Sequence, residues 1–427
     1  MKFSLKDLFR RKQIPTKTKD NGEVSVDFIY SNDTINITHR AARICYGLEP
    51  KSTFEDKIEH LSRIICKGHQ SVAEHSNIIM LITLDEKAYI KLTPDFITGI
   101  GKFMNMETKV VEDKIYILIG GSTRAYQDIF LMNDIKSVTD NLILDEIRNI
   151  LYRESYSFFF NELCNSLVFN RSEFDDDIEK LMLDDENNII INELPKNPPK
   201  KTNKHYDSSI TVVNIDNLDY IFNRLKYIME DDVFSVDTLF KFATASIVFE
   251  KLSRSASDQL NRHRNAISMQ SQRYVDSSSH EFINPLDYKI EFKDVETDAK
   301  YDIHTKYIND SMTLKEIGNT MIEVYSQLVE QGLAKEDARS ILPMNVESKE
   351  IMTFTLSNLS HFVKLRTRVG VQAEIRSKAI DVKILINELL LNFTEIEPPL
   401  IEEYLYSKLE RSIRDMSNKL DLISEEV

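Results

Sequence analysis

The chain has 427 residues, 42% of them hydrophobic, which is enough to bury one large or two ordinary domain cores. Its 54 Lys and Arg against 69 Asp and Glu give a formal charge of −15, which argues against nonspecific binding of nucleic acid or anionic lipid over the whole surface. Neither a long apolar run nor a secretory signal is evident, so we expect a cytoplasmic protein without a membrane span. The three cysteines lack paired or metal-ligand spacing, so we expect no disulfide framework and no metal site.

The first third of the chain predicts strands and helices in alternation, from the period of its apolar residues. We expect a strand at 24–30, a helix at 34–46, an amphipathic helix at 54–67, and strands at 77–84 and 115–121. Asn36 and Thr38 are the candidate caps of the first helix. No internal repeat is evident in the sequence.

A strand followed by a helix is predicted over 245–264, and the helix ends in three consecutive basic residues. Arg262, His263 and Arg264 can reach one target only if that target is extended and anionic, such as phosphate joined to a ring system. A solvated basic helix end is the alternative interpretation. Just beyond, a serine and an arginine at 271 and 273 add a hydroxyl and a second guanidinium.

This stretch resembles the signature of the flavin-dependent thymidylate synthases, in which RHR is followed, usually after seven residues, by Ser-x-Arg. Other blocks resemble the same family in the same order: AARICYG at 41–47, GHQSVAEH at 68–75, YSQLVEQGLAKEDARSILP at 325–343 and SHFVKLRTRVGVQAEIR at 360–376. GGSTRAYQDIF at 120–130 resembles a segment found in longer members.

The resemblance implies an α+β fold, with a mixed β-sheet flanked by helices, and a methyltransferase of dTMP biosynthesis. The enzyme would methylate dUMP to dTMP with methylenetetrahydrofolate, and FAD would carry hydride from NADPH. Small molecules would be its partners, without nucleic acid or membrane, and the implied assembly is a homotetramer with active sites between subunits. The alternatives are a flavin-dependent transferase acting on another pyrimidine nucleotide, and a noncatalytic homologue serving as a binding or structural subunit.

The family pattern is interrupted here, because 187 positions (262 − 75) separate His75 from Arg262 where the family has a short connection. We therefore expect a catalytic domain in two parts, 1–85 and 236–427, with an insertion at 86–235. Within it, 173–206 is charge-rich and interrupted by prolines, which predicts a flexible loop outside the catalytic core.

Site residues follow from the resemblance, position by position. The residues expected to bind dUMP are Gln259, Arg262, Gln270, Ser271, Arg273, Arg339 and Arg366. Those expected to bind FAD are His69, Ser71, Glu74, Arg262, His263, Arg264, Thr355, Ser357 and His361. Arg366 is the expected catalytic residue, because a guanidinium against the pyrimidine edge stabilises the ring deprotonated at N3. The family uses this route in place of a cysteine nucleophile, and no activated cysteine is identifiable here.

Two departures from the family pattern bear on flavin binding. Six residues, 265–270, precede Ser271 instead of seven, and Gln270 takes the role that the family places one residue earlier, here Met269. Thr355 and Ser357 stand where the family has Asn-x-Arg, so a charge-assisted contact of about 1.5–3 kcal/mol is missing, unless the insertion supplies another donor.

Overall fold

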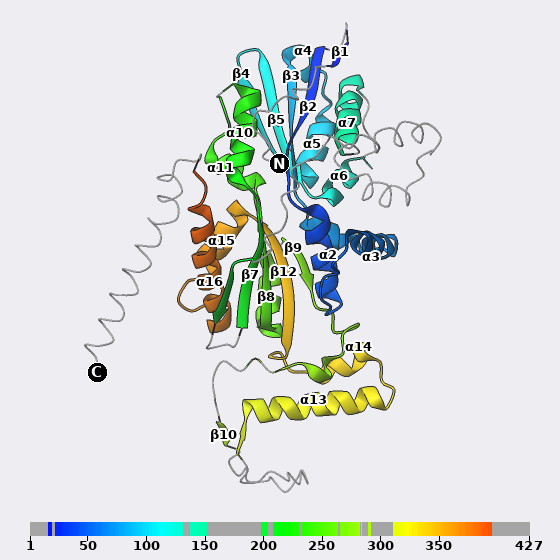
Figure 1. Ribbon diagram of the computed structural model, residues 1–427, viewed down its shortest axis with the longest axis vertical. Helices are drawn as coiled ribbons and strands as arrows, with labels where there is room; N and C mark the ends of the chain where they lie inside the picture. The colour runs from blue at the N-terminus through cyan, green and yellow to red at the C-terminus, as the bar shows by residue number, and fades with distance from the viewer. Residues whose placement is uncertain are drawn as a thin grey trace, which may run out of the picture.

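The computed structural model describes residues 16–18, 22–130, 137–151, 198–203, 208–230, 232–263, 265–281, 283, 289–291 and 311–394. Two five-stranded sheets lie one beyond the other along the long axis of the molecule (Figure 1), with strand orders β1-β2-β3-β5-β4 and β6-β7-β8-β12-β9. Helices cover both sheets, so the α+β class is confirmed. Every described strand pair is antiparallel, where a mixed sheet was expected.

The first sheet comes from the N-terminal part of the chain. Its strands are β1 (Thr16–Thr18), β2 (Gly22–Ser31), β3 (Ile78–Asp85), β4 (Asn105–Val111) and β5 (Lys114–Gly121). The helical segments between and after them are α2 (Thr34–Cys45), α3 (Phe54–Cys66), the 3-10 helix η1 (Gln70–His75), α4 (Glu86–Tyr89), α5 (Pro94–Phe103), α6 (Thr123–Phe130) and α7 (Val138–Leu151). The five elements predicted in this part are confirmed. The cap of α2 is Asp33, whose carboxylate accepts from the backbone N–H of Asn36, rather than Asn36 or Thr38.

The second sheet comes from the C-terminal part. Its strands are β6 (Lys200–Asn203), β7 (Ser208–Ile215), β8 (Thr244–Ser253), β9 (Ala266–Met269) and β12 (Glu347–Thr355). Its helical segments are α10 (Leu218–Met229), α11 (Val236–Phe242), α12 (Arg254–Leu260), η4 (Asn261–His263), α15 (Leu356–Arg366) and α16 (Ala373–Leu390). At its far end lie η5 (Ser277–Ser279), the ribbon β10 (Lys289–Glu291) and β11 (Ser311–Thr313), α13 (Leu314–Glu330), α14 (Lys335–Ala338) and η6 (Arg339–Ile341).

The strand and helix predicted over 245–264 are confirmed, as β8 and α12. Of the predicted flexible loop 173–206, residues 173–197 and 204–206 lie outside the described residues. The short part that is described forms β6, an edge strand paired with β7, because its extended backbone completes the ladder. No helix in the described part of the chain is long and apolar enough to cross a membrane.

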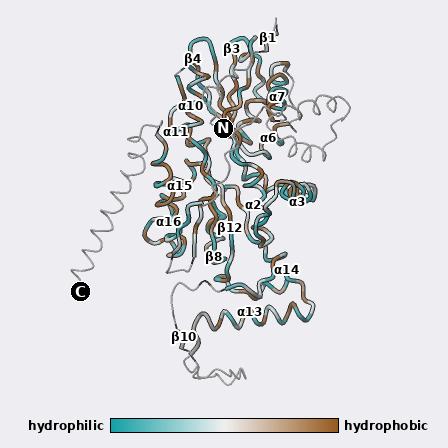
Figure 2. Tube along the Cα trace, viewed as in Figure 1, coloured by the Kyte–Doolittle hydropathy of each residue, from teal (hydrophilic) through white to brown (hydrophobic). Residues whose placement is uncertain are grey.

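The two sheets share their covering helices. The helix α2, which follows a strand of the first sheet, packs on β9 and β12 of the second, while α10 packs on β2 and α11 on β4 and β5. Hydrophobic residues gather along the strands (Figure 2), and one core cluster contains Ile79 and Leu118 of the first sheet together with Phe242 and Phe354. Burying these side chains together makes the two sheets one folding unit.

Asp216 joins the sheets through buried hydrogen bonds. Its Oδ2 accepts from the side-chain Nδ2 of Asn77 at 2.7 Å and from the backbone N–H of Thr244 at 2.7 Å. The Thr244 hydroxyl donates to the same oxygen at 2.8 Å, and Asn214 donates to Oδ1 at 3.0 Å. Burial raises the pKa of Asp216, while these donors oppose the rise.

We predict that Asp216→Ala destabilises the protein by roughly 3 kcal/mol or more, because it leaves the buried donors of Asn77 and Thr244 without an acceptor. Asp216→Asn keeps one acceptor oxygen and should cost less. Urea unfolding of both variants beside the wild type measures the difference. A loss below about 1 kcal/mol for Asp216→Ala would show that water replaces the carboxylate.

Candidate functional site

Three of the predicted site residues meet where α12, η4 and α15 converge. The Nε of Arg366, the last residue of α15, donates to Nε2 of His263 at 2.8 Å. Its Nη2 donates to the backbone carbonyl of Gln259 at 3.0 Å, and Nη1 lies 3.4 Å from the Gln259 side-chain oxygen. Gln259 in turn donates to Gln372 at 2.6 Å, a contact that the sequence did not suggest. We call Gln259, His263 and Arg366 the arginine cluster.

His263 is held in its neutral form. Burial first, and then the charges of Arg366 and His361, lower its pKa to about 4. Because Nε2 accepts from Arg366, the ring proton resides on Nδ1. The ring also meets Phe362 edge-on, with centroids 5.0 Å apart, which fixes its plane.

The arginine cluster therefore carries positive charge without internal compensation. Burial and the neighbouring Arg262 lower the pKa of Arg366 below its usual value, but not enough to discharge a guanidinium. The Arg262 side chain is exposed and makes no hydrogen bond or ion pair with any described residue. Arg264 lies outside the described residues. Two guanidinium groups beside a neutral imidazole form a setting suited to an anionic ligand.

A second group of predicted residues lies beyond the other end of β9. The carboxylate of Glu336 accepts from Arg273 Nε at 2.8 Å, and its backbone carbonyl accepts from Arg339 Nε at 3.1 Å. The Ser271 backbone N–H donates to Cys45 O at 3.0 Å, and Gln270 Nε2 lies 3.2 Å from His280 Nε2.

The expected dUMP ligands thus form two groups within one chain. Gln259 and His263 of the arginine cluster precede β9 in the chain, whereas Gln270, Ser271 and Arg273 follow it. The four residues of the strand, roughly 13 Å of extended chain, therefore lie between them.

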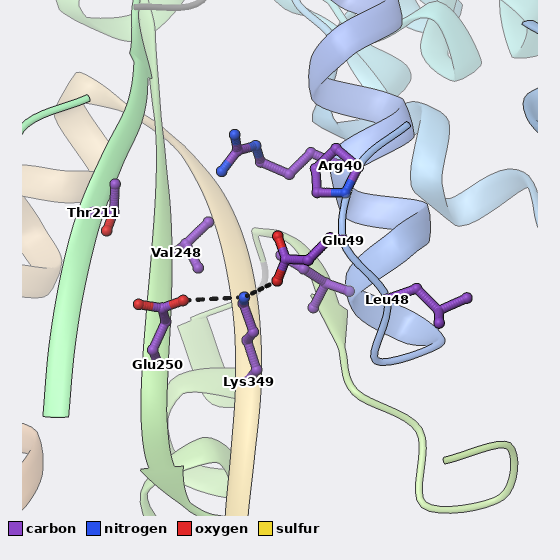
Figure 3. A pocket seen from close by; sticks show the side chains of 9 residues that line it. Arg40, Leu48, Glu49, Thr211, Val248, Glu250 and Lys349 are labelled. Atoms are coloured by element: carbon purple, nitrogen blue, oxygen red, sulfur yellow. Dashed lines mark ion pairs between the residues drawn. The ribbon is translucent and has the colours of Figure 1, made fainter. Parts of the chain in front are cut away.

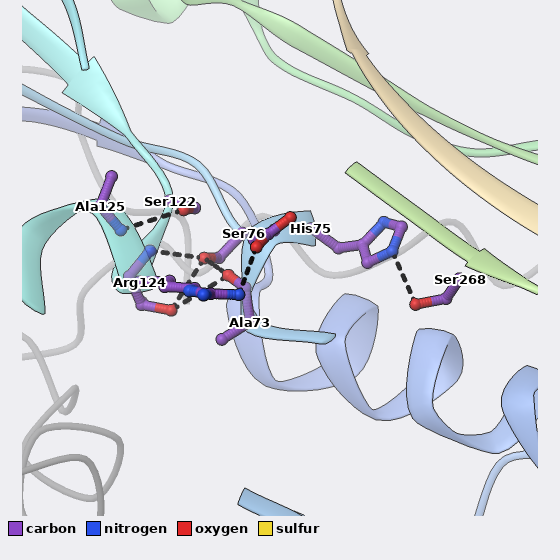
Figure 4. A network of polar contacts seen from close by, with 9 residues as sticks. Ala73, His75, Ser76, Ser122, Arg124, Ala125 and Ser268 are labelled. Carbon is purple, nitrogen blue, oxygen red and sulfur yellow. Dashed lines mark hydrogen bonds and ion pairs between the residues drawn. The ribbon is translucent and has the colours of Figure 1, made fainter. Parts of the chain in front are cut away.

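The loop GHQSVAEH forms η1, which His75 anchors to the second sheet. His75 is fully buried, and burial lowers its pKa to about 3. Its Nδ1 lies 2.9 Å from the Thr353 hydroxyl. Its Nε2 lies 3.0 Å from the Ser268 hydroxyl, as Figure 4 shows. His75 therefore has a structural role, and no three metal-ligating side chains are grouped in the described part of the chain.

The expected flavin ligands of this loop lie on its more exposed side. Glu74 pairs with Arg124 at 2.6 Å, and both side chains are partly exposed. The ring of His69 lies 6.2 Å from that of Tyr46 and 6.4 Å from that of Tyr274, and Ser71 is exposed. Arg124 belongs to GGSTRAYQDIF, a segment already noted for its resemblance to longer family members. Its contact with Glu74 could not be predicted, because the two residues are 50 positions apart in the chain.

The remaining expected flavin ligands lie on α15. The Thr355 hydroxyl caps this helix by accepting from the Asn358 backbone N–H at 3.2 Å, so it is already engaged. Ser357 is partly buried and His361 is exposed. Neither Thr355 nor Ser357 offers a cation.

A small cavity elsewhere, about 80 Å³, contains none of the predicted residues (Figure 3). It lies between α2 and the strands β7, β8 and β12, and Glu250 and Lys349 are 3.0 Å apart on its wall. Bonds from Lys200, Ser209 and Lys349 outweigh burial and lower the pKa of the Glu250 carboxyl to about 2. We interpret this network as structural, because its carboxylate already has its partners.

Comparison with known proteins finds similarity to one enzyme family. Residues 186–389 match the family model described as thymidylate synthase complementing protein. The flavin-dependent thymidylate synthase of Thermococcus onnurineus is 33% identical over 145 residues, which are 34% of this chain and 54% of that protein. The enzyme of the same name from Pyrococcus horikoshii is 36% identical over 147 residues, again 34% and 54%. The predicted resemblance to the flavin-dependent thymidylate synthases is confirmed.

The extent of this likeness is limited. The chain spans about half the length of the curated relatives it matches. A solved structure of thymidylate synthase X from Helicobacter pylori, with FAD and dUMP, covers 44% of this chain and 82% of that one at 17% identity and a TM-score of 0.27, which supports no conclusion. The family match begins at residue 186, inside the predicted insertion 86–235, whose bounds remain a prediction.

We predict that Arg366→Ala raises the pKa of His263 from about 4 toward 6.5, because it removes a repelling charge and admits water. Titration of ¹⁵N-labelled histidines by NMR measures the change, with His263→Gln to assign the signal. The same shift makes the free energy of unfolding depend on pH. Because the pKa of His263 is lower in the folded protein than in the unfolded chain, its contribution to stability is fully present above pH 6.5 and falls as the pH drops toward 4. An unchanged His263 pKa in Arg366→Ala would mean that residues other than Arg366 exclude water from the imidazole ring.

Proposed function

We propose that the protein is a flavin-dependent thymidylate synthase, a methyltransferase that converts dUMP to dTMP. Its co-substrates would be methylenetetrahydrofolate and NADPH, and it would act in the cytoplasm as a homotetramer with small molecules as its partners. The observation that carries the proposal is the arginine cluster, in which Arg366, the expected catalytic residue, lies against two other expected ligands. The family match of residues 186–389 supports it.

The residues present fit a flavin nucleotide. Arg262 has an exposed guanidinium without a partner among the described residues, beside the neutral ring of His263. A diphosphate joined to a ring system needs this combination of cation and planar group. FAD, when bound, would supply the hydride chemistry. We propose that the residues holding it are His69, Ser71, Glu74, Arg262, His263, Arg264, Thr355, Ser357 and His361.

The proposed catalytic role of Arg366 follows from its fixed orientation. His263 and Gln259 occupy three of its N–H directions, which holds the guanidinium plane in place before substrate arrives. A uracil ring becomes electron-rich at C5 when N3 loses its proton, and a preorganised cation beside the ring stabilises that anion. The other dUMP ligands that we propose are Gln259, Arg262, Gln270, Ser271, Arg273 and Arg339.

The Cys45 thiol is not suited to act as a nucleophile in place of Arg366. Burial raises the pKa of the Cys45 thiol, so the nucleophilic thiolate is disfavoured. Its backbone carbonyl accepts from the Ser271 N–H, while its sulfur is hydrogen-bonded to Ser268 and the Met269 backbone.

The proposal is tested by giving the purified protein dUMP, methylenetetrahydrofolate, NADPH and FAD, and separating the nucleotides by chromatography. Formation of dTMP is expected. Flavin-dependent NADPH oxidation without dTMP would favour another pyrimidine nucleotide as substrate, and a protein that binds neither flavin nor nucleotide would be a noncatalytic homologue.

We predict that Arg366→Lys abolishes dTMP formation, by a factor of about 100 or more, while NADPH oxidation falls less than about tenfold. Lysine keeps the charge but cannot maintain the planar contacts to His263 and Gln259. Both rates are measured on one preparation, with Lys364→Ala, an exposed change on the same helix, as the control. An equal fall in both rates would show that Arg366 supports the fold of the site rather than the nucleotide reaction.

A further inference from the structure

We propose that the chain is an internal duplication, and that Arg124 of the first repeat supplies the phosphate-binding guanidinium that the second repeat lacks at Ser357. The ligand class is a flavin nucleotide, so the inference rests on the proposed function. The first repeat comprises the sheet of β1 to β5 with α2 to α7, and the second comprises the sheet of β6 to β9 and β12 with α10 to α16.

The two sheets have the same topology. Numbered by their order in the chain, the strands of each sheet lie in the order 1-2-3-5-4, and all neighbours are antiparallel. In each, the ladder between the second and third strands shifts register at one place. The shift falls between Phe28 and Tyr30 in the first sheet and between Val212 and Asn214 in the second, so each strand has one extra residue at the same position.

The segment that follows the second strand, which we call the corner, forms the same hydrogen bonds in both repeats. In the first repeat the backbone of Asn32 donates to Asn77 O at 3.1 Å, and Asn32 Oδ1 accepts from Asn77 N at 3.0 Å. In the second repeat the backbone of Asp216 donates to Thr244 O at 2.9 Å, and Asp216 Oδ2 accepts from Thr244 N at 2.7 Å.

A helix of 12 residues follows each corner. The caps are Asp33 for α2 and Asn217 for α10, and each accepts from the backbone N–H three residues later. The two helices thus have the same length and the same kind of cap at equivalent positions, which is not expected if the first part of the chain were an unrelated insertion.

The helices between the second and third strands are exchanged between the repeats. Helix α2 of the first repeat packs on β9 and β12, and α10 of the second repeat packs on β2, while α11 packs on β4 and β5 and also on β12 of its own sheet (Figure 1). The helices after the fifth strands, α6 and α15, each pack on their own sheet. This reciprocal exchange is the arrangement of two subunits around a two-fold axis, here within one chain.

The strand registers assign Arg124 its counterpart. Ile78 and Ala245 are equivalent, and they pair with Gly121 and Phe354 respectively. Counting three residues onward from each places Arg124 at the position of Ser357. The caps confirm the count, because the hydroxyls one residue after the pairs, at Ser122 and Thr355, accept from Ala125 N and Asn358 N, both at 3.2 Å.

The two repeats carry complementary parts of the expected site. RHR follows the third strand of the second repeat, whereas residues 86–103, which follow the third strand of the first, contain neither Arg nor His. Conversely, GHQSVAEH precedes the third strand of the first repeat, whereas residues 216–243 of the second contain no His. One chain therefore holds one set of the residues that the resemblance assigns to flavin.

Arg124 is placed to bind an anion in that set. Its Nη1 donates to Glu74 Oε1 at 2.6 Å, and Nε and Nη2 have no partner among the described residues. Figure 4 shows its side chain beside η1, which His75 fastens to Ser268 of β9, the strand that follows the RHR segment. Glu74 orients the guanidinium and leaves two of its nitrogens for phosphate oxygens.

The experiment compares the affinities of wild type, Arg124→Ala and Arg124→Lys for FAD and for riboflavin, which has the ring but no phosphate, by flavin fluorescence. Arg148→Ala, an arginine of α7 paired with Asp145 in the same repeat, is the matched control. Arg124→Ala should weaken FAD binding roughly 10- to 100-fold and leave riboflavin binding within about twofold, and Arg124→Lys should weaken FAD binding less than Ala.

Equal FAD affinity in wild type and Arg124→Ala would overturn the inference, and so would a loss that is the same for FAD and riboflavin. If Arg124→Ala does not fold, as judged by its thermal transition, the lysine variant decides: its loss of affinity for FAD should exceed its loss of affinity for riboflavin. Failure of the proposed function can be told apart from failure of this inference, because in the first case the wild-type protein itself binds no flavin.

Discussion

The buried corner where Asn77 meets Asp216 is the constraint on which the rest of the molecule depends. The pairing of the second and third strands of each sheet ends there, and one carboxylate oxygen accepts from both Asn77 and Thr244. A buried carboxylate is stable only when donors occupy its lone pairs, so these hydrogen bonds favour the register in which the two sheets meet. In this arrangement η1 of the first sheet packs against β9 of the second, which joins the two groups of candidate flavin ligands.

The electrostatics of the site follow from burial rather than from overall charge. The chain is acidic, with a formal charge of −15, yet Arg262 and Arg366 lie together beside a histidine that burial keeps neutral. Had His263 been charged, the repulsion of three adjacent cations would have opened the cluster. As a neutral acceptor it instead directs Arg366, and the remaining positive potential is available to a ligand.

Local structure could be predicted from the sequence because it depends on local periodicity. The alternation in β2 and the apolar stripe of α3 each specify their element within a few residues. The arginine cluster was also within reach, because its members belong to motifs read by resemblance. The cap of α2 was missed, since choosing Asp33 over Asn36 depends on where the preceding strand ends.

The pairing of strands could not be predicted, because it is set by contacts between residues far apart in the chain. The two repeats share strand order, register shift and caps, but different side chains fill the same positions. Asn32 corresponds to Asp216, and Ser122 to Thr355; each pair performs one hydrogen-bonding task with two residue types. Sequence comparison therefore reads the first repeat as an insertion, whereas the backbone hydrogen bonds identify it as a second copy.

A duplicated chain changes how the site can evolve. In an assembly of identical subunits every copy must keep every ligand, because a substitution appears in all sites at once. Within one chain the two copies can differ, so the first can lose its basic helix end and the second its guanidinium at Ser357, provided that one complete set remains. An assembly of four such units, as the resemblance implies, would need only two chains. The long separation between His75 and Arg262 then spans the end of the first repeat and the start of the second, and is not an interruption of the catalytic domain.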